Sequence, residues 1–130
     1  MASSLTAVLC AVTWASGAVL TLPAAITEAE QRVGLSGQTE TDSMAFVWDS
    51  AERRPVWMRD TSIALSAGWI DNAGTLTEIM ELDPFDETIR WSQEPARIMI
   101  EMPAGEFEAA GIRVGDHIES LDCKQAEERP

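Results

Sequence analysis

The chain has a single histidine, His117, which directly follows Asp116. A carboxylate beside an imidazole can orient the ring as a general base, and Ser66 is the hydroxyl that a Ser-His-Asp triad would use. Ser66 is not flanked by the glycines of a nucleophile elbow, however. We therefore favour a solvated strand histidine, and we predict no catalytic residue.

Paired carboxylates can act as acid and base where their environments separate their pKa values, and Asp60 with Asp116 is the best such pair. Pairs of this kind arise easily among 22 acidic residues, so we favour strand-end aspartates that accept backbone hydrogen bonds. A further acidic group could attract calcium but lacks the loop spacing of a calcium-binding hand. Its members are Glu78, Glu81, Asp83, Asp86 and Glu87. We predict no metal and no other cofactor.

Aromatic, charged and hydroxyl side chains stand next to one another in a short stretch of the chain. Trp57, Arg59, Asp60 and Thr61 could line a ligand pocket, because such pockets combine apolar walls with a few polar groups. Arg97 could complete an anion site there. This is a hypothesis for a ligand-binding site.

The five tryptophans are unusual in a chain without tyrosine. Tryptophan is favoured in the hot spots of protein interfaces. Trp91, with Arg90 beside it, is our candidate for an exposed interaction anchor. Alternation of side chains predicts that Trp57 and Trp69 pack inside.

The elements that must position these residues are short strands. Apolar stretches between turn residues predict strands at 44–48, 56–58, 65–70, 75–82, 97–102 and 117–121. In the fifth strand the residues alternate between a core face and a wetter face. The core face has Ile98, Ile100 and Met102, and the wetter face has Arg97, Met99 and Glu101. With short helices at 28–33 and 106–110, this pattern predicts a mainly β fold, a small barrel-like or sandwich-like sheet with one or two short helices.

Residues 5–26 carry no charge, and the run is long enough to cross a bilayer. It is interrupted by polar and turn-forming residues, and no basic residue precedes it, as one would in a signal peptide. We predict a β-hairpin instead, with strands at 5–14 and 18–26 that turn at 15–17. An export signal or membrane anchor is the alternative. The hairpin would belong to one β-rich domain over residues 1–123, followed by a solvated tail over 124–130.

The formal net charge is −13, which would repel nucleic-acid phosphates, so we predict no nucleic-acid partner and, with the hairpin, no membrane partner. Cys10 and Cys123 lie near opposite ends of the chain and have no metal-ligand spacing. Because no export signal is evident, we expect two free thiols rather than a disulfide.

The stretch from Pro55 to Thr61 resembles the Trp-Met-basic-Asn-Thr signature of the domain-of-unknown-function 192 family. Other landmarks follow in the family's order over about residues 22–121. They are Thr27 to Leu35, Met44 to Trp48, Ile63 to Ser66, Trp69 to Gly74, Pro95 to Glu101, Ala104-Gly105 and Gly111 to Asp116. The resemblance implies a β-rich fold and no particular reaction. Ser36, Asp60 and Ser66 replace the Met, Asn and Asp that the family usually has.

These observations predict a non-enzymatic protein-binding or assembly module, with other protein subunits as its partners. Members of the family occur in phage genomes, so a virion component is one concrete form, and the location would then be the cytoplasm or a virion assembly. Export is the alternative location. The alternative function is a small-molecule or anion-binding domain, possibly hydrolytic, that uses the pocket near Trp57.

Overall fold

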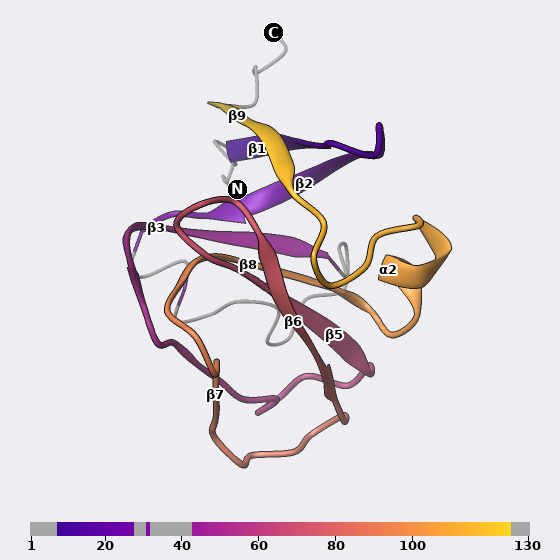
Figure 1. Cartoon of the computed structure of the whole chain (residues 1–130). Helices are drawn as coiled ribbons and strands as arrows, with labels where there is room; N and C mark the ends of the chain where they lie inside the picture. Colours follow the sequence, from indigo (N-terminus) through magenta and orange to yellow (C-terminus); the bar gives the residue numbers. More distant parts are fainter. Residues whose placement is uncertain (1–7, 28–30, 32–42, 126–130) are drawn as a thin grey trace, which may run out of the picture.

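The computed structural model of the chain describes residues 8–27, 31 and 43–125 (Figure 1). The described strands are β1 (Val8–Trp14), β2 (Val19–Ala25), β3 (Met44–Glu52), β4 (Pro55–Val56), β5 (Leu65–Ile70), β6 (Leu76–Leu82), β7 (Arg90–Trp91), β8 (Ala96–Pro103) and β9 (Ile118–Gln125). One short helix, α2 (Glu106–Ala109), is described as well. The predicted helix at 28–33 lies outside the described residues except for Gln31. The predicted mainly β fold is confirmed.

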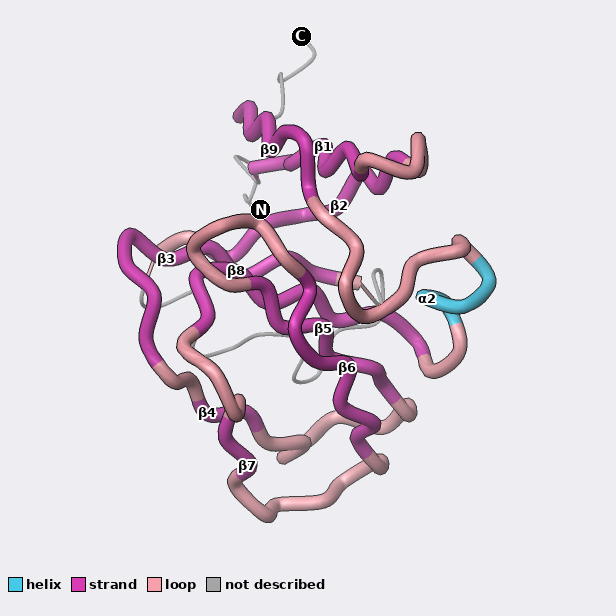
Figure 2. Tube along the Cα trace, in the orientation of Figure 1, coloured by secondary structure: helices cyan, strands magenta, loops and turns pink. Residues whose placement is uncertain are grey.

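Seven strands form one large sheet in the order β6-β5-β8-β3-β2-β1-β9, and β4 pairs with β7 in a separate small sheet (Figure 2). Neighbouring strands of the large sheet are antiparallel except β2 and β3, which are parallel and pair over only two residues. The sheet does not close into a barrel. The turn before its outer strand β6 nevertheless meets the start of the other outer strand, β9, where the Ile118 N–H donates to the Gly74 carbonyl at 2.9 Å.

The central strands β5 and β8 are covered on both faces. All six residues of β5 are buried, and so are Met99 and Glu101 on β8. The prediction of a wetter face for β8 is therefore wrong at these two residues. A strand in the middle of a curled sheet has a hydrophobic cluster on each side, as in sheets that are covered on both faces.

One of these clusters lies beside the amino-terminal hairpin and contains Trp14, Ile70, Ile100 and Phe107. A Cβ atom on Gly68 would lie 2.7 Å from Cζ of Phe107, so the glycine allows α2 to pack closely on the sheet. The other cluster contains Phe46, Met58, Trp69 and Met99. Met58 connects it to the stretch that carries the Trp-Met motif.

The hairpin predicted for the charge-free amino-terminal run is present as β1 and β2, with its turn at residues 15–17. In the part of the chain that the structure describes, no helix is long and apolar enough to span a membrane. The carboxy-terminal strand runs to Gln125, so the first two residues of the predicted tail belong to β9.

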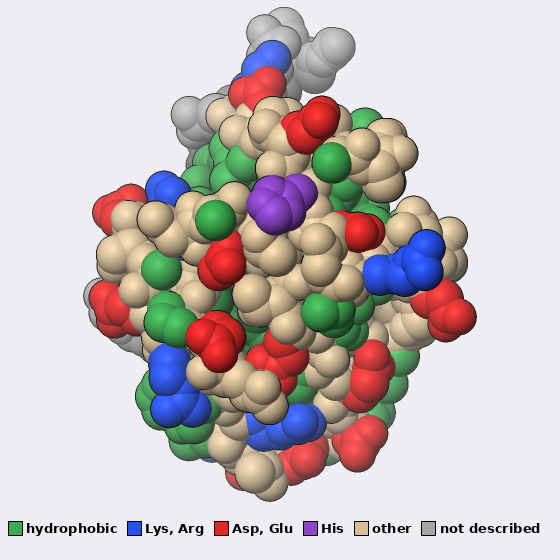
Figure 3. Space-filling model, in the orientation of Figure 1, with side chains coloured by type: hydrophobic (Ala, Val, Ile, Leu, Met, Phe, Trp, Pro, Cys, Tyr) green, Lys and Arg blue, Asp and Glu red, His purple; other side chains and the backbone are tan. Residues whose placement is uncertain are grey.

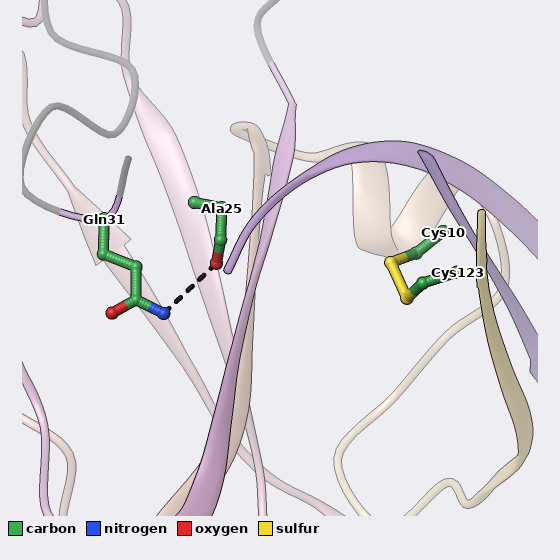
Figure 4. The surroundings of a disulfide bond; sticks show 4 residues. All are labelled: Cys10, Ala25, Gln31 and Cys123. Atoms are coloured by element: carbon green, nitrogen blue, oxygen red, sulfur yellow. Dashed lines mark hydrogen bonds between the residues drawn. A yellow bond between two sulfur atoms is a disulfide. The ribbon is translucent and has the colours of Figure 1, made fainter. Parts of the chain in front are cut away.

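The expectation of two free thiols is wrong, because Cys10 and Cys123 form a disulfide (Figure 4). The two residues are direct partners in the register between β1 and β9. This register brings together residues that are 113 positions apart in the chain. The spacing of the cysteines in the sequence contains no information about it.

Near the short contact between β2 and β3, the side chain of Gln31 supplies extra hydrogen bonds (Figure 4). Its Nε2 donates to the carbonyl of Ala25 on β2 at 3.2 Å and to the carbonyl of Val47 on β3 at 3.0 Å. The amide thus bridges the two strands where they pair over so few residues.

Candidate functional site

The Trp-Met motif forms a tight turn after β4. Met58 is buried, and its N–H donates to the Asp86 carbonyl at 2.9 Å. Asp60 has a φ of 58°, a left-handed conformation that Asp and Asn tolerate better than most residues. The hydroxyl of Thr61 donates to the Arg59 carbonyl at 3.2 Å. The polar residues of the motif therefore shape the turn.

The residues predicted to line a pocket have separate roles in the structure. Trp57 is 41% exposed, so the prediction that it packs inside is wrong. The guanidinium carbon of Arg59 lies 5.4 Å from the centre of the Trp57 ring, in a cation–π contact. Arg97 lies on β8, where its Nε donates to the Trp48 carbonyl of β3 at 2.9 Å. The structure thus brings Trp57, Arg59 and Thr61 together in one turn and gives Arg97 a partner on β3.

Large apolar side chains are exposed around the small β4–β7 sheet. Pro55 pairs directly with Trp91, which is 50% exposed. The loop before β7 exposes Phe85 (62%) and Ile89 (55%). We call the exposed surface formed by Trp57, Phe85, Ile89 and Trp91 the tryptophan face.

The space-filling view agrees with this arrangement. Figure 3 shows hydrophobic and basic side chains together at the lower left, in the region where Figure 2 has β4 and β7. Exposed apolar patches of this kind mark interaction sites in many proteins.

The tryptophan face rests on a well-connected support. Ser92 is fully buried, and its N–H donates to the Arg54 carbonyl at 2.9 Å. Its hydroxyl accepts from the Arg54 N–H at 3.0 Å, and its carbonyl accepts from Nε of Arg53 at 2.9 Å. The guanidinium carbon of Arg54 in turn lies 4.5 Å from the centre of the Trp48 ring. These contacts attach β7 to the end of β3 and hold Trp91 in a defined place.

Arg90, the other predicted interaction residue, is exposed beside Trp91. It pairs with Val56 across the small sheet, and its Nη1 donates to the Glu81 carbonyl at 2.8 Å. This hydrogen bond attaches the small sheet to the outer strand β6. Through this hydrogen bond, Arg90 helps to hold the tryptophan face in place.

The hypothetical triad is not formed. The Ser66 hydroxyl donates to Oε1 of Glu81 at 2.8 Å, and His117 lies against Thr75, with 3.1 Å between Nε2 and Oγ1. Asp116 accepts from the Arg113 N–H at 3.0 Å, the backbone hydrogen bond favoured for a strand-end aspartate. Among the described residues, no three His, Cys, Asp or Glu side chains come together as a metal site.

Acids near the tryptophan face have partners within the fold. Glu78 accepts from the Gln93 N–H at 3.1 Å. Hydrogen bonds from the backbone and side chain of Thr88 lower the pKa of Asp86. These carboxylates organise the loops around β7.

The sequence analysis did not predict that one acidic residue would be buried. Glu101 is 4% exposed, with Met44 and Ala67 as its partners on the two neighbouring strands. Desolvation raises its pKa to about 7. On β5, the indole N–H of Trp69 is buried without a hydrogen-bond partner. The sequence contained a signal for the burial of Glu101, because residues 98–102 form a nearly continuous apolar run with one carboxylate inside it. Such runs are typical of strands that are buried on both faces.

Comparison with known proteins identifies relatives without assigning a reaction. The model of the DUF192 family, described as "Uncharacterized ACR", matches residues 11–120. A protein of unknown function from Novosphingobium aromaticivorans has a similar crystal structure, with a TM-score of 0.75 and 31% identity, and the match covers 86% of this chain and 84% of that one. A putative transcription regulator from Sinorhizobium meliloti has a TM-score of 0.75 at 23% identity, covering 95% and 98% of the two chains, and shares the fold. No curated protein matches the chain.

Proposed function

Since this chain belongs to the DUF192 family, whose description names no reaction, we propose a function from its geometry: a non-enzymatic protein-binding or assembly module that docks through the tryptophan face. The observation that carries the proposal is the exposure of Trp57 and Trp91 at 41% and 50% on a well-supported small sheet. Exposed indoles on a rigid support lose little conformational freedom on binding, and tryptophan is enriched among the residues that dominate interface energies.

The partner would be another protein subunit, in a multi-subunit assembly such as a virion. A second copy of the chain is less suited, because two molecules of formal charge −13 repel one another. The alternative, a small-molecule or anion site near the Trp-Met motif, has less support. The Thr61 hydroxyl and Nε of Arg97 already donate to backbone carbonyls.

The disulfide bears on where the module would act. Disulfides persist in oxidising compartments and are rare in the reducing cytosol. The Cys10–Cys123 bond therefore favours the exported location over the cytoplasmic one as part of this proposal.

Site-specific photo-crosslinking in the native host tests the proposal. A photoreactive phenylalanine analogue would replace Trp91 in one variant and Val114 in the other. Val114 is the matched control because it is exposed to 56% but lies in the loop between α2 and β9. The partner crosslinked from position 91 would be identified by mass spectrometry and purified.

Calorimetry with that partner then measures its affinity for the wild-type protein and for two alanine variants. Trp91→Ala should weaken binding by about 30-fold or more, as truncation of a hot-spot residue does. Val114→Ala should leave the affinity unchanged. Equal crosslinking from both positions, or an unaltered Kd for Trp91→Ala, would contradict docking through the tryptophan face.

A further inference from the structure

The last described strand of the large sheet has a single neighbouring strand along most of its length. β9 is an outer strand, and its register pairs it with β1 from Trp14↔Ile118 to Val8↔Gln125. Contacts with the residues just before β6 occur where β9 begins, at the Thr75↔His117 bridge and at the hydrogen bond from the Ile118 N–H to the Gly74 carbonyl. Beyond that point, among the described strands, residues 119–125 form backbone pairs with β1 alone.

Side-chain burial holds β9 less firmly than β1, although Ile118 and Leu121 pack against the cluster that contains Trp14. Ile118, Leu121 and Cys123 are half-buried, and the side chains between them are exposed. β1 differs, because Cys10, Val12 and Trp14 are fully buried. Segments with few buried apolar contacts open with the lowest free energies. Packing therefore anchors β1 in the core more firmly than β9.

The disulfide joins these two unequal strands near their outer ends (Figure 4). Cys10 and Cys123 are direct register partners, so the bond fixes the part of β9 that is farthest from β6. Of the two cysteines, Cys123 is half-buried and Cys10 is fully buried. Cys123 is therefore the more accessible of the two cysteines to a reductant.

We propose that the disulfide is a redox latch for β9: its reduction releases residues 119–125 from β1 while the central strands stay folded. The co-reactant is a dithiol. One thiolate of the dithiol attacks Sγ of Cys123, the S–S bond breaks, and the Cys10 sulfur leaves as a thiolate that takes up a proton. The second thiol of the dithiol then displaces Cys123, so the dithiol is oxidised to a disulfide and both cysteines are reduced.

The released state differs from the latched state in one main respect. The edge of β1 loses its partner, and its backbone N–H and carbonyl groups become open to another strand. This inference does not depend on the tryptophan face, which lies on other strands.

Hydrogen exchange on the full-length chain, followed by mass spectrometry, tests the latch. Spectra of the oxidised protein and of the protein reduced with dithiothreitol would be compared, with alkylation to verify complete reduction. Peptides from β9 should exchange at least about 30-fold faster after reduction, the factor that matches the lower end of native disulfide stabilisation. Peptides from β3, β5 and β8 should exchange as before.

Leu121→Ala is the matched control, because it removes a half-buried side chain from β9 and leaves the disulfide intact. The oxidised variant should keep most of the protection of β9. The latch is refuted if β9 stays protected after complete reduction. It is also refuted if reduction unfolds the central strands, or if Leu121→Ala in the oxidised protein frees β9 as much as reduction does.

Discussion

Glu101→Gln should change how the stability of the protein depends on pH. The pKa of Glu101 is raised from 4.5 to about 7 by burial, so between these values the folded protein binds a proton that the unfolded chain has released. Stability therefore falls as pH rises from 4.5, and the loss is complete above about 7. A shift of about 2.5 units, at 1.36 kcal/mol per unit, corresponds to a loss of about 3 kcal/mol.

Urea denaturation between pH 4 and pH 8.5 measures this loss as the free energy of unfolding. The other carboxylates titrate in both proteins, so the difference between wild type and Glu101→Gln isolates the buried group. The glutamine amide stays polar and buried, which costs a constant amount at every pH. We expect the variant to gain about 3 kcal/mol relative to wild type between pH 4 and pH 8.

Glu119→Gln is the matched control, since it removes the same charge from an exposed position on β9. Its stability should follow the wild-type curve within about 0.5 kcal/mol. If the curves of Glu101→Gln and wild type run parallel across the whole pH range, the carboxyl is hydrated or paired in solution, and the reasoning from burial fails.

The remaining predictions concern the fold. Asp60→Asn should leave the urea midpoint nearly unchanged, whereas Asp60→Ala should lose about 1 kcal/mol because alanine disfavours a left-handed backbone; equal losses would contradict the turn. Trp57→Ala should cost little in thermal melting, whereas Trp69→Ala should cost about 3–5 kcal/mol, so similar melting temperatures would refute their assignment to surface and core. Gly68→Ala should lower stability by about 1–3 kcal/mol through overpacking. An unchanged denaturation curve would show instead that α2 can move away from the sheet to make room for the added methyl group. Deletion of residues 1–21 should give an insoluble or unfolded product in expression trials, and a soluble, cooperatively folding fragment would sink this prediction.

The sequence predicted most strands well because apolar residues in short stretches identify strands whatever their neighbours are. The strand at 65–70 was predicted with its observed limits, Leu65–Ile70. The two-residue strand β7 was missed, since Arg90 and Trp91 are both exposed and leave no alternating pattern.

Burial at the candidate site was harder to predict than strand position. Trp57 was assigned to the core from the alternation of side chains, although Val56 and Met58 on either side are the buried residues. Alternation shows which residues share a face of a strand but not which of the two faces is buried, so the opposite assignment, with the indole outside, fits the same stretch. The burial of Glu101 depends on a second layer over β8, and the sequence of one strand cannot show which face another segment will cover.

The pairing of β1 with β9 also sets an order of events during synthesis. β1 leaves the ribosome early, but Cys123, the partner of Cys10, is added 113 residues later. At typical translation rates this interval is roughly 6 to 23 s. Throughout it the hairpin has one strand edge without its final neighbour, in a nascent chain that can still aggregate or meet a chaperone. The amino-terminal hairpin therefore reaches its final pairing only after β9 has been made, when this strand pairs with β1.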